Sequence, residues 1–90
     1  HLHQWATPPR SGYHGDYYSW QMNLPRDVHR AKLAALADAF ERAFGFRAIA
    51  HRAGRYGALP ETYEDLAEIG VRLDFSPCPA FDFSARGGPD

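Results

Sequence analysis

Residues 46–75, FRAIAHRAGRYGALPETYEDLAEIGVRLDF, decide the fold that the sequence predicts. Residues 46–51 are mostly apolar and run into a loop rich in Gly and Arg, a pattern typical of a buried strand. A short helix is expected over about 61–69, where Gly70 ends it, and residues 71–75 then alternate apolar and polar side chains with the period of a strand. Because a helical crossover joins parallel neighbours, the stretch predicts two parallel strands.

A longer helix is predicted upstream, over residues 26–44. The segment is rich in Ala and Leu, Asn23 is a good N-cap, Pro25 suits the first turn, and Gly45 is a typical helix end. His29 lies near the positive end of the helix dipole and is expected on the surface. The buried face is expected to contain Val28, Leu36, Ala39, Phe40, Ala43 and Phe44, and the solvated face Arg30, Lys32, Asp38, Glu41 and Arg42.

The N-terminal stretch HLHQWATPP places His1, His3 and Trp5 at alternate positions. Residues 1–5 predict the end of a strand, and on an extended strand alternate side chains project from one face. The two imidazoles could hold a metal ion. The alternative is that they bind none, because a catalytic metal takes three protein ligands and two alone bind weakly.

Residues 6–24 predict a long loop that is rich in Pro, Gly and Ser and also carries Tyr13, Tyr17, Tyr18 and Trp20. Loops of this length without regular structure are often functional. Aromatic rings on a loop could stack on the flat apolar faces of a sugar, or they could plug the end of a sheet or barrel. Both uses are consistent with the sequence.

Length, charge and cysteine content limit the classes of function. Ninety residues suffice for one small core, so the chain is one domain or part of one. Ten Lys and Arg against eleven Asp and Glu give a net charge of −1, without the basic stripe of nucleic-acid binders. The apolar runs are too short for a membrane-spanning helix. The single cysteine, Cys78, excludes an internal disulfide and a cysteine-based zinc site.

The predicted order is strand, helix, strand, helix, strand, which is an α/β class with parallel strands. The carboxyl ends of these strands carry three polar clusters: His1 with His3, Arg52 with Arg55, and Asp74. Ligands of open α/β sheets and barrels bind at this edge, so the clusters predict one site. The alternative is that the arginines form surface ion pairs and that Asp74 caps the end of its strand.

Several motifs resemble those of the polysaccharide deacetylases, the NodB-homology domains of carbohydrate esterase family four, and most closely their WalW-like branch of lipopolysaccharide biosynthesis. The matching stretches are HLHQWATPP, RAGRYG followed by PETYEDLAEIG, VRLDFSPCP, and the closing GGPD. The resemblance implies part of a deformed (β/α) barrel. It also implies a divalent metal, commonly zinc, held by an Asp and two His, which polarises an acyl carbonyl and activates water.

The resemblance implies roles for individual residues. His1 and His3 fall where the family's metal-binding histidines lie. Arg52 matches an arginine that positions the catalytic acid, and the backbone donor to the oxyanion falls near Tyr56. Asp74 belongs to a motif that walls the substrate groove, so Arg52, Tyr56 and Asp74 are the candidate catalytic residues. The candidate substrate-binding residues are Trp5, Tyr17 and Trp20.

Two classes of function follow. The first is a metal-dependent hydrolase that removes N-acetyl or related acyl groups from a cell-surface polysaccharide or oligosaccharide. The second is a non-catalytic glycan-binding or scaffold domain, because His-x-His replaces the family's usual His-x-x-x-His. The family's paired aspartates and its final histidine motif lie outside residues 1–90. We therefore expect the central piece of one deacetylase domain, inactive alone and covered by the rest of a longer chain or by another copy.

Overall fold

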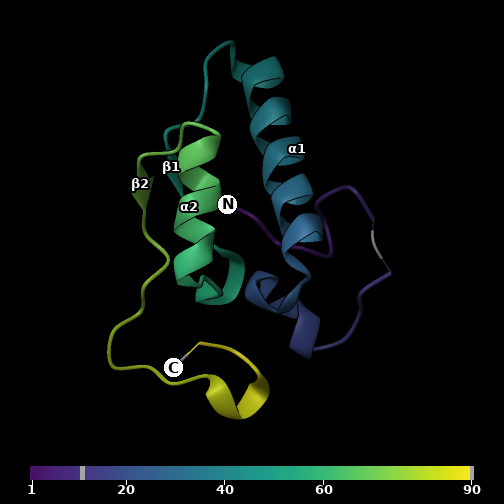
Figure 1. Cartoon of the computed structure of the whole chain (residues 1–90), viewed down its shortest axis with the longest axis vertical. Coiled ribbons are helices and arrows are strands. Elements are labelled where there is room, and N and C mark those ends of the chain that lie inside the picture. The colour runs from purple at the N-terminus through teal and green to yellow at the C-terminus, as the bar shows by residue number, and fades with distance from the viewer. Residues whose placement is uncertain (11, 90) are drawn as a thin grey trace.

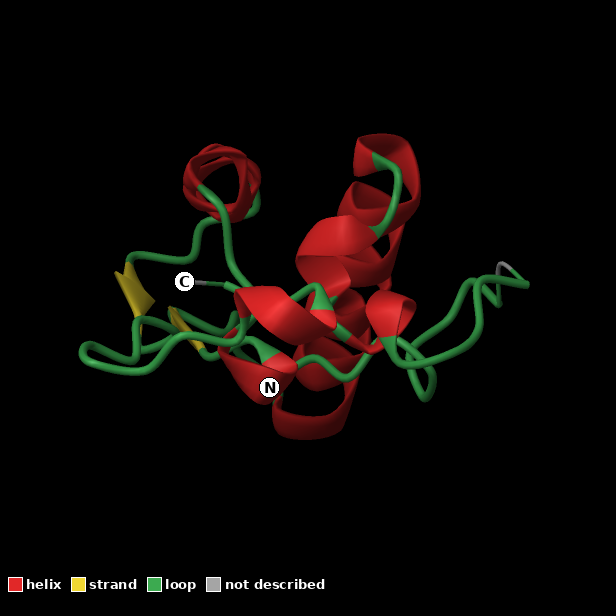
Figure 2. Cartoon of the chain, turned by 90° about the horizontal axis from the view of Figure 1, so that it is seen from below, coloured by secondary structure: helices red, strands yellow, loops and turns green. Residues whose placement is uncertain are grey.

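The computed structural model describes residues 1–10 and 12–89. In this part of the chain the regular elements are α1 (Arg26–Phe44), β1 (Ala50–His51), α2 (Pro60–Glu68) and β2 (Leu73–Asp74). The two helices lie side by side, with the two strands next to α2 (Figure 1). Figure 2 shows the strands at one side of the molecule and the long loop that precedes α1 at the other. Short 3₁₀ turns occur at Tyr17–Ser19, Gln21–Asn23, Gly54–Tyr56 and Ser84–Arg86.

Both predicted helices are confirmed, within one residue at each end. Helix α1 ends at Gly45, which has φ +79° and donates its backbone N–H to Glu41 O at 2.8 Å. This left-handed conformation is easy for glycine and typical of a helix C-terminus. Helix α2 begins at Pro60, and Thr62 Oγ1 accepts the backbone N–H of Leu59 at 3.0 Å. Local capping signals therefore help to fix the C-terminus of α1 and the N-terminus of α2.

The prediction that Asn23 caps α1 is wrong, because the helix begins two residues later, after Pro25. The Asn23 side chain instead donates to Tyr17 O at 2.8 Å and to Gly87 O at 2.6 Å. It thereby joins the loop before α1 to the C-terminal tail. A side-chain amide can bond to several kinds of partner, and here the Asn23 side chain bonds to these two carbonyls instead of to the backbone N–H groups at the start of α1.

The predicted buried face of α1 is wrong in part: Val28, Leu36 and Phe40 are partly buried, but Ala39, Ala43 and Phe44 are exposed. His29 and Lys32, expected on the surface, are only 5% and 1% exposed, whereas Phe44 is 63% exposed. The buried stripe follows the 3–4 spacing through His29, Lys32, Leu33 and Ala37. The Lys32 ammonium is buried because three backbone carbonyls accept its hydrogen bonds.

The strands pair in parallel, with Ala50 opposite Leu73 and His51 opposite Asp74. The prediction of a strand-helix-strand-helix-strand piece of a (β/α) barrel is nevertheless wrong. Within residues 1–10 and 12–89 the sheet has two strands of two residues each, which is too little strand for such an architecture. The N-terminal segment contributes an isolated parallel bridge from Leu2 to Ala53.

The N-terminal segment does not extend into a strand because it turns immediately after the bridge. The backbone N–H of Ala6 bonds to His3 O at 3.1 Å, and that of Thr7 bonds to Gln4 O at 3.4 Å. These turn bonds replace the sheet bonds that an extended residue 1–5 segment would make.

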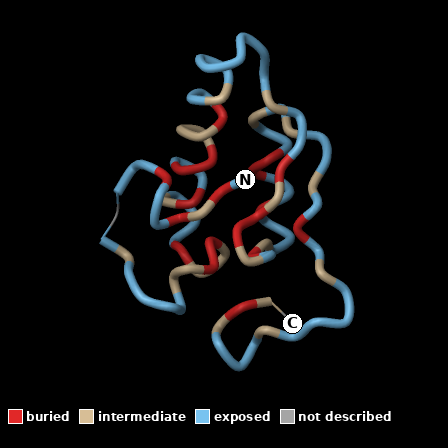
Figure 3. The backbone as a smooth tube through the Cα atoms, turned by 180° about the vertical axis from the view of Figure 1, so that it is seen from behind, coloured by how far each residue is buried: buried red, intermediate tan, exposed pale blue. Residues whose placement is uncertain are grey.

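The apolar core lies where the N-terminal segment, α1 and α2 meet. Leu2, Leu33 and Leu66 are at most 3% exposed and form its centre. Buried segments run through the middle of the molecule, and the end of α1 with the turn that follows is exposed (Figure 3). The prediction of no membrane segment agrees with the structure: across the described residues, neither helix has the combined length and apolarity needed to cross a bilayer. Partly buried side chains around the core are Leu36, Ile69 and Val71.

Candidate functional site

The imidazoles of His1 and His3 converge. Their Nε2 atoms lie 3.0 Å apart and their ring centroids 4.6 Å apart. Gly54 permits this arrangement, since a Cβ at residue 54 would lie 2.6 Å from Leu2 O and would overlap the His3 ring. The backbone N–H of Gly54 donates to Leu2 O at 2.7 Å. Gly54, the first glycine of the RAGRYG stretch, therefore holds the histidine segment by direct backbone contact.

Lys32 fixes the same segment from the other side. Its ammonium donates to the carbonyl oxygens of Gln4, Thr7 and Pro9 at 3.1, 2.5 and 2.6 Å. Burial lowers the pKa of Lys32, and the nearby charge of Arg10 adds to the effect. All three hydrogen-bond donors of the ammonium are thus used to hold the turn that follows His3.

Arg52 lies beside the histidine pair. Its Nη2 is 3.2 Å from His1 Nε2, and its guanidinium carbon is 5.3 Å from the centre of the Tyr56 ring. A guanidinium only donates hydrogen bonds, so His1 Nε2 is the acceptor in this contact. The structure therefore brings together three of the predicted site residues, His1, His3 and Arg52, with Tyr56 next to them.

Tyr56 adopts an unusual backbone conformation. Arg55 and Tyr56 have φ values of +55° and +60°, which side-chain-bearing residues rarely adopt. The backbone N–H of Tyr56 donates to Ala53 O at 3.1 Å. This N–H is thus engaged within the turn, and Tyr56 is 37% exposed.

Asp74 belongs to a separate network. Its Oδ1 lies 2.7 Å from His51 Nδ1 and accepts the Ser76 hydroxyl at 2.8 Å, while Oδ2 accepts the Ser76 backbone N–H at 3.0 Å. Ser76 Oγ in turn accepts the Ala53 backbone N–H at 2.8 Å. Burial lowers the pKa of His51, and the Asp74 carboxylate opposes that shift. Asp74 thus links the ends of the two strands through side-chain hydrogen bonds. Among the described residues it makes no hydrogen bond to Arg52.

The three predicted substrate-binding aromatics occupy different environments. Trp5 is 55% exposed, and its ring centroid lies 4.6 Å from that of His3. Tyr17 is 54% exposed and packs edge-on against Tyr18. Trp20 is 1% exposed, donates its indole N–H to Arg55 O at 3.0 Å, and has the Arg55 guanidinium 3.6 Å from its ring centroid. Of the three, only Trp5 adjoins the histidine pair.

Sequence reasoning missed Lys32, Ser76 and the tail aromatics Phe81 and Phe83. Lys32 gives no local signal of burial, because its hydrogen-bond partners are the carbonyls of Gln4, Thr7 and Pro9, more than twenty positions away. Ser76 follows Asp74 by two residues, a spacing at which a carboxylate can bind the backbone. The tail was expected to be an irregular loop, and nothing in its pattern indicates that its rings meet Tyr56.

His1 and His3 are placed so that both could ligate one metal ion. Zinc binds imidazole nitrogen at about 2.0–2.1 Å, so one ion can contact two nitrogens that lie 3.0 Å apart. Among residues 1–10 and 12–89, no group of three or more His, Cys, Asp or Glu side chains is placed to hold a metal. A metal bound by His1 and His3 would need a third ligand from outside this set.

Comparisons with known proteins add no assignment. No family model matches the chain, and neither a curated protein nor a solved structure shows significant similarity to it. The likeness to polysaccharide deacetylases accordingly depends on the sequence motifs and stays a prediction.

Proposed function

We propose that the chain contributes two metal ligands, His1 and His3, to a hydrolase that removes N-acetyl or related acyl groups from a cell-surface glycan. The observation that supports this proposal best is the 3.0 Å separation of the two Nε2 atoms. A divalent ion held there would polarise the acyl carbonyl and supply an activated water.

The chain's own residues account for how the pair is positioned. Gly54 allows the backbone to pass directly beneath Leu2 and His3, and Lys32 holds the turn after His3 through three carbonyls. Arg52 lies beside the histidine pair and donates a hydrogen bond to His1 Nε2. Its guanidinium is suited to orient a carboxylate or a carbonyl oxygen of a substrate.

Zinc titration monitored by imidazole NMR signals tests the proposal. We expect zinc to shift the signals of His1 and His3 together, and the double substitution His1→Ala, His3→Ala to abolish this binding. Because only two ligands are supplied, zinc affinity in the ninety-residue chain should be weak. His14→Ala is the matched control, since His14 is exposed and distant in sequence. Equal zinc affinity in the double variant and the unchanged chain would contradict the proposal.

A second candidate function is a glycan-binding domain without chemistry. The observation that favours it is Trp5, which is 55% exposed beside His3 and presents an aromatic face to solvent. Glycan binding that persists in the absence of metal and in the His1→Ala, His3→Ala variant, together with no specific zinc binding, would favour this second function.

A further inference from the structure

A pocket of about 300 Å³ lies between α1, α2 and the segment that leads into β1. Its wall is largely apolar, and the two helices supply leucine, isoleucine and phenylalanine side chains to it. An apolar cavity of about 150 Å³ is enough to hold one benzene ring, so this pocket has room for a two-ring molecule. The lining side chains from the helices include Leu33, Leu36, Phe40, Leu66 and Ile69.

The pocket connects the surface with the apolar core. Phe46 and Ile49 line it on the side of the segment before β1, and they are 61% and 56% exposed. Leu33 and Leu66 also line it, are 3% exposed, and belong to the centre of the core. A ligand can therefore reach the core from solvent through this pocket.

His51 is the side chain of the pocket wall that is both polar and buried. The residue is 6% exposed, and its Nε2 atom has no hydrogen-bond partner within residues 1–10 and 12–89. A buried polar atom without a partner is unfavourable, so a ligand that supplies a hydrogen bond there gains free energy from it. The pocket thus combines an apolar wall with one unsatisfied polar group, a composition typical of small-molecule sites.

The hydrogen bonds of Asp74 determine where the His51 ring carries its hydrogen. The Asp74 carboxylate accepts the N–H and the hydroxyl of Ser76, and its Oδ1 lies 2.7 Å from His51 Nδ1. Because a carboxylate only accepts hydrogen bonds, Nδ1 carries the hydrogen and donates it. Burial lowers the pKa of His51, so the ring is neutral at pH 7. Nε2 of this neutral ring is therefore a hydrogen-bond acceptor.

We propose that this pocket binds a compact apolar alcohol or phenol whose hydroxyl donates a hydrogen bond to His51 Nε2. The hydrocarbon part packs against the apolar side chains of α1 and α2. An ether of the same shape has no donor, and a carboxylate would bring an unpaired charge into an apolar wall. The inference goes beyond the proposed function, because it requires no metal at His1 and His3.

The test uses the metal-free ninety-residue chain at pH 7 and two matched probes, 2-naphthol and its methyl ether, 2-methoxynaphthalene. In calorimetry we expect 2-naphthol to bind more tightly by about 3- to 10-fold, the range expected for one neutral hydrogen bond. Hydrophobic contact alone would favour the ether, which is the more apolar probe. Equal or tighter binding of the ether, or no saturable binding of 2-naphthol, overturns the proposal.

Nitrogen NMR of the imidazoles identifies the acceptor. Bound 2-naphthol should shift the signal of His51 Nε2. His29 is the internal control, because its Nε2 is also buried without a partner in the described part of the chain but His29 is not part of the pocket wall. Binding that leaves the His51 signal unchanged, or that shifts both rings equally, contradicts the assignment.

A filled pocket gives a third readout. Ala48 lines the pocket and is half-buried, so Ala48→Phe should weaken 2-naphthol binding by about 10-fold or more, because the new ring occupies part of the space. Ala58→Phe is the matched control, since Ala58 is also half-buried but lies outside this wall. Equal weakening in the two variants, both folded by circular dichroism, overturns the proposal. If Ala48→Phe does not fold, the comparison of the two probes still decides. A dimer in sedimentation that Ala48→Phe disrupts and 2-naphthol does not would place a second copy in the pocket and would also overturn it.

Discussion

His51 and Asp74 lie directly opposite each other on the two strands, and the imidazole Nδ1 is 2.7 Å from the carboxylate Oδ1. Both side chains are at most 9% exposed. The carboxylate also accepts two hydrogen bonds from Ser76, so one buried group joins β1, β2 and the residue that follows β2. A sheet of two residues per strand has few backbone bonds of its own, and these side-chain bonds supplement them.

Replacing Asp74 should therefore destabilise the whole chain. Asp74→Ala leaves His51 Nδ1 and both Ser76 donors without their acceptor, and we expect a loss of about 2–3 kcal/mol in the free energy of unfolding by urea. Asp74→Asn, which keeps an acceptor oxygen, should recover part of this loss. Asp38→Ala is the control, since Asp38 is 61% exposed. A loss in Asp74→Ala no larger than in Asp38→Ala would contradict the structural role.

Stability should fall as the pH is lowered from about 6.5 toward 4. Burial lowers the pKa of His29 to about 4, with His51 acting in the same direction and Asp65 opposing. An unfolded His titrates near 6.5, so between these values the unfolded chain binds more protons and is favoured by acid. His29→Leu should remove about 2–3 kcal/mol of this pH dependence in urea unfolding at pH 7 and 4.5. In contrast, His14→Leu should leave the dependence unchanged; if both variants behave alike, His29 is not the titrating group.

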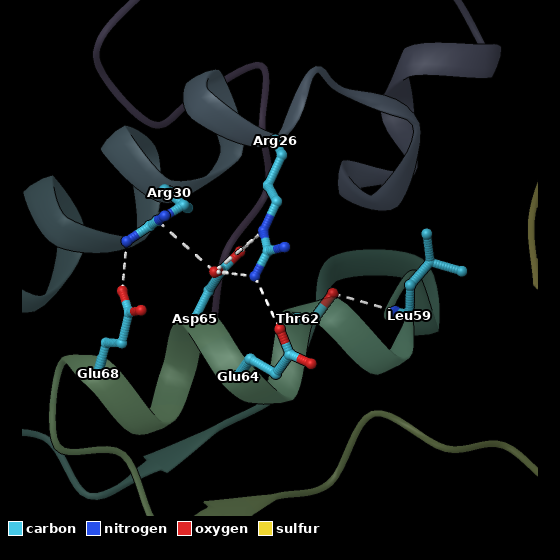
Figure 4. Close-up of polar contacts among 7 residues, drawn as sticks. All are labelled: Arg26, Arg30, Leu59, Thr62, Glu64, Asp65 and Glu68. Atoms are coloured by element: carbon cyan, nitrogen blue, oxygen red, sulfur yellow. Dashed lines mark hydrogen bonds and ion pairs between the residues drawn. The ribbon is translucent and has the colours of Figure 1, made fainter.

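Asp65 is the central acceptor of a charge cluster between the helices. Figure 4 shows Arg26 and Arg30 of α1 reaching Asp65 on α2. Arg26 Nη2 is 2.9 Å and Arg30 Nε is 3.5 Å from Asp65 Oδ1, and the carboxylate is 2% exposed. The arginines also pair with Glu64 and Glu68 nearer the surface.

Asp65→Ala removes the buried acceptor of both arginines and should lower the free energy of unfolding by about 1–2 kcal/mol. The loss is no larger because the partly exposed arginines can be solvated by water once their partner is gone. The control is Glu64→Ala, whose side chain is 69% exposed and should contribute little. Thermal and urea unfolding measure both. Equal losses would show that the buried carboxylate has no special role.

The parts of the fold that depend on local signals could be predicted from sequence. Helix α1 follows from its Ala and Leu content and from Gly45, and all of these act within one segment. Its buried face could not be predicted, because Lys32 is buried through carbonyls of residues 4–9, which lie more than twenty positions away. The strands were overestimated for a related reason: an apolar run becomes a strand only if a neighbour pairs with it along its length.

In the candidate site, too, only the features that depend on neighbouring residues could be predicted from the sequence. The alternation of His1, His3 and Trp5 correctly predicts that their rings adjoin, although the backbone turns after His3 instead of extending. The sequence predicts only that Arg52 and His1 lie at the same edge of a sheet. In the structure the two side chains are in contact, although the backbone there forms a single bridge, between Leu2 and Ala53. The position of the tail rings Phe81 and Phe83 could not be predicted, because Gly88, which bonds to Phe83, packs against the distant and buried Trp20.

Lys32→Met should affect both stability and zinc binding. Methionine keeps much of the volume but leaves the carbonyls of Gln4, Thr7 and Pro9 without a donor, at a cost of about 2–3 kcal/mol. Because these carbonyls hold the turn after His3, zinc affinity should also fall in the variant under conditions where circular dichroism shows it folded. Unchanged zinc affinity in a folded Lys32→Met chain would mean that Lys32 does not position the histidines.

Arg52→Gln should strengthen zinc binding by about 5-fold. The guanidinium occupies the lone pair of His1 Nε2 and places a positive charge beside the ion, an unfavourable contribution of about 1 kcal/mol at a solvated site. The prediction rests on the proposed metal site, and titration of both chains at one pH and ionic strength tests it. Weaker binding in Arg52→Gln would instead indicate that Arg52 supports the site.

The contrast between the two tryptophans makes the chain its own fluorescent reporter. Trp20 is 1% exposed and packs under the Arg55 guanidinium, whereas Trp5 is 55% exposed next to His3. A single-tryptophan variant that keeps Trp20 should shift its emission to the red when the loop and tail separate. A variant that keeps Trp5 should change its emission when a ligand or metal reaches the histidines. Global unfolding and occupancy of the candidate site can thus be followed as two independent optical signals.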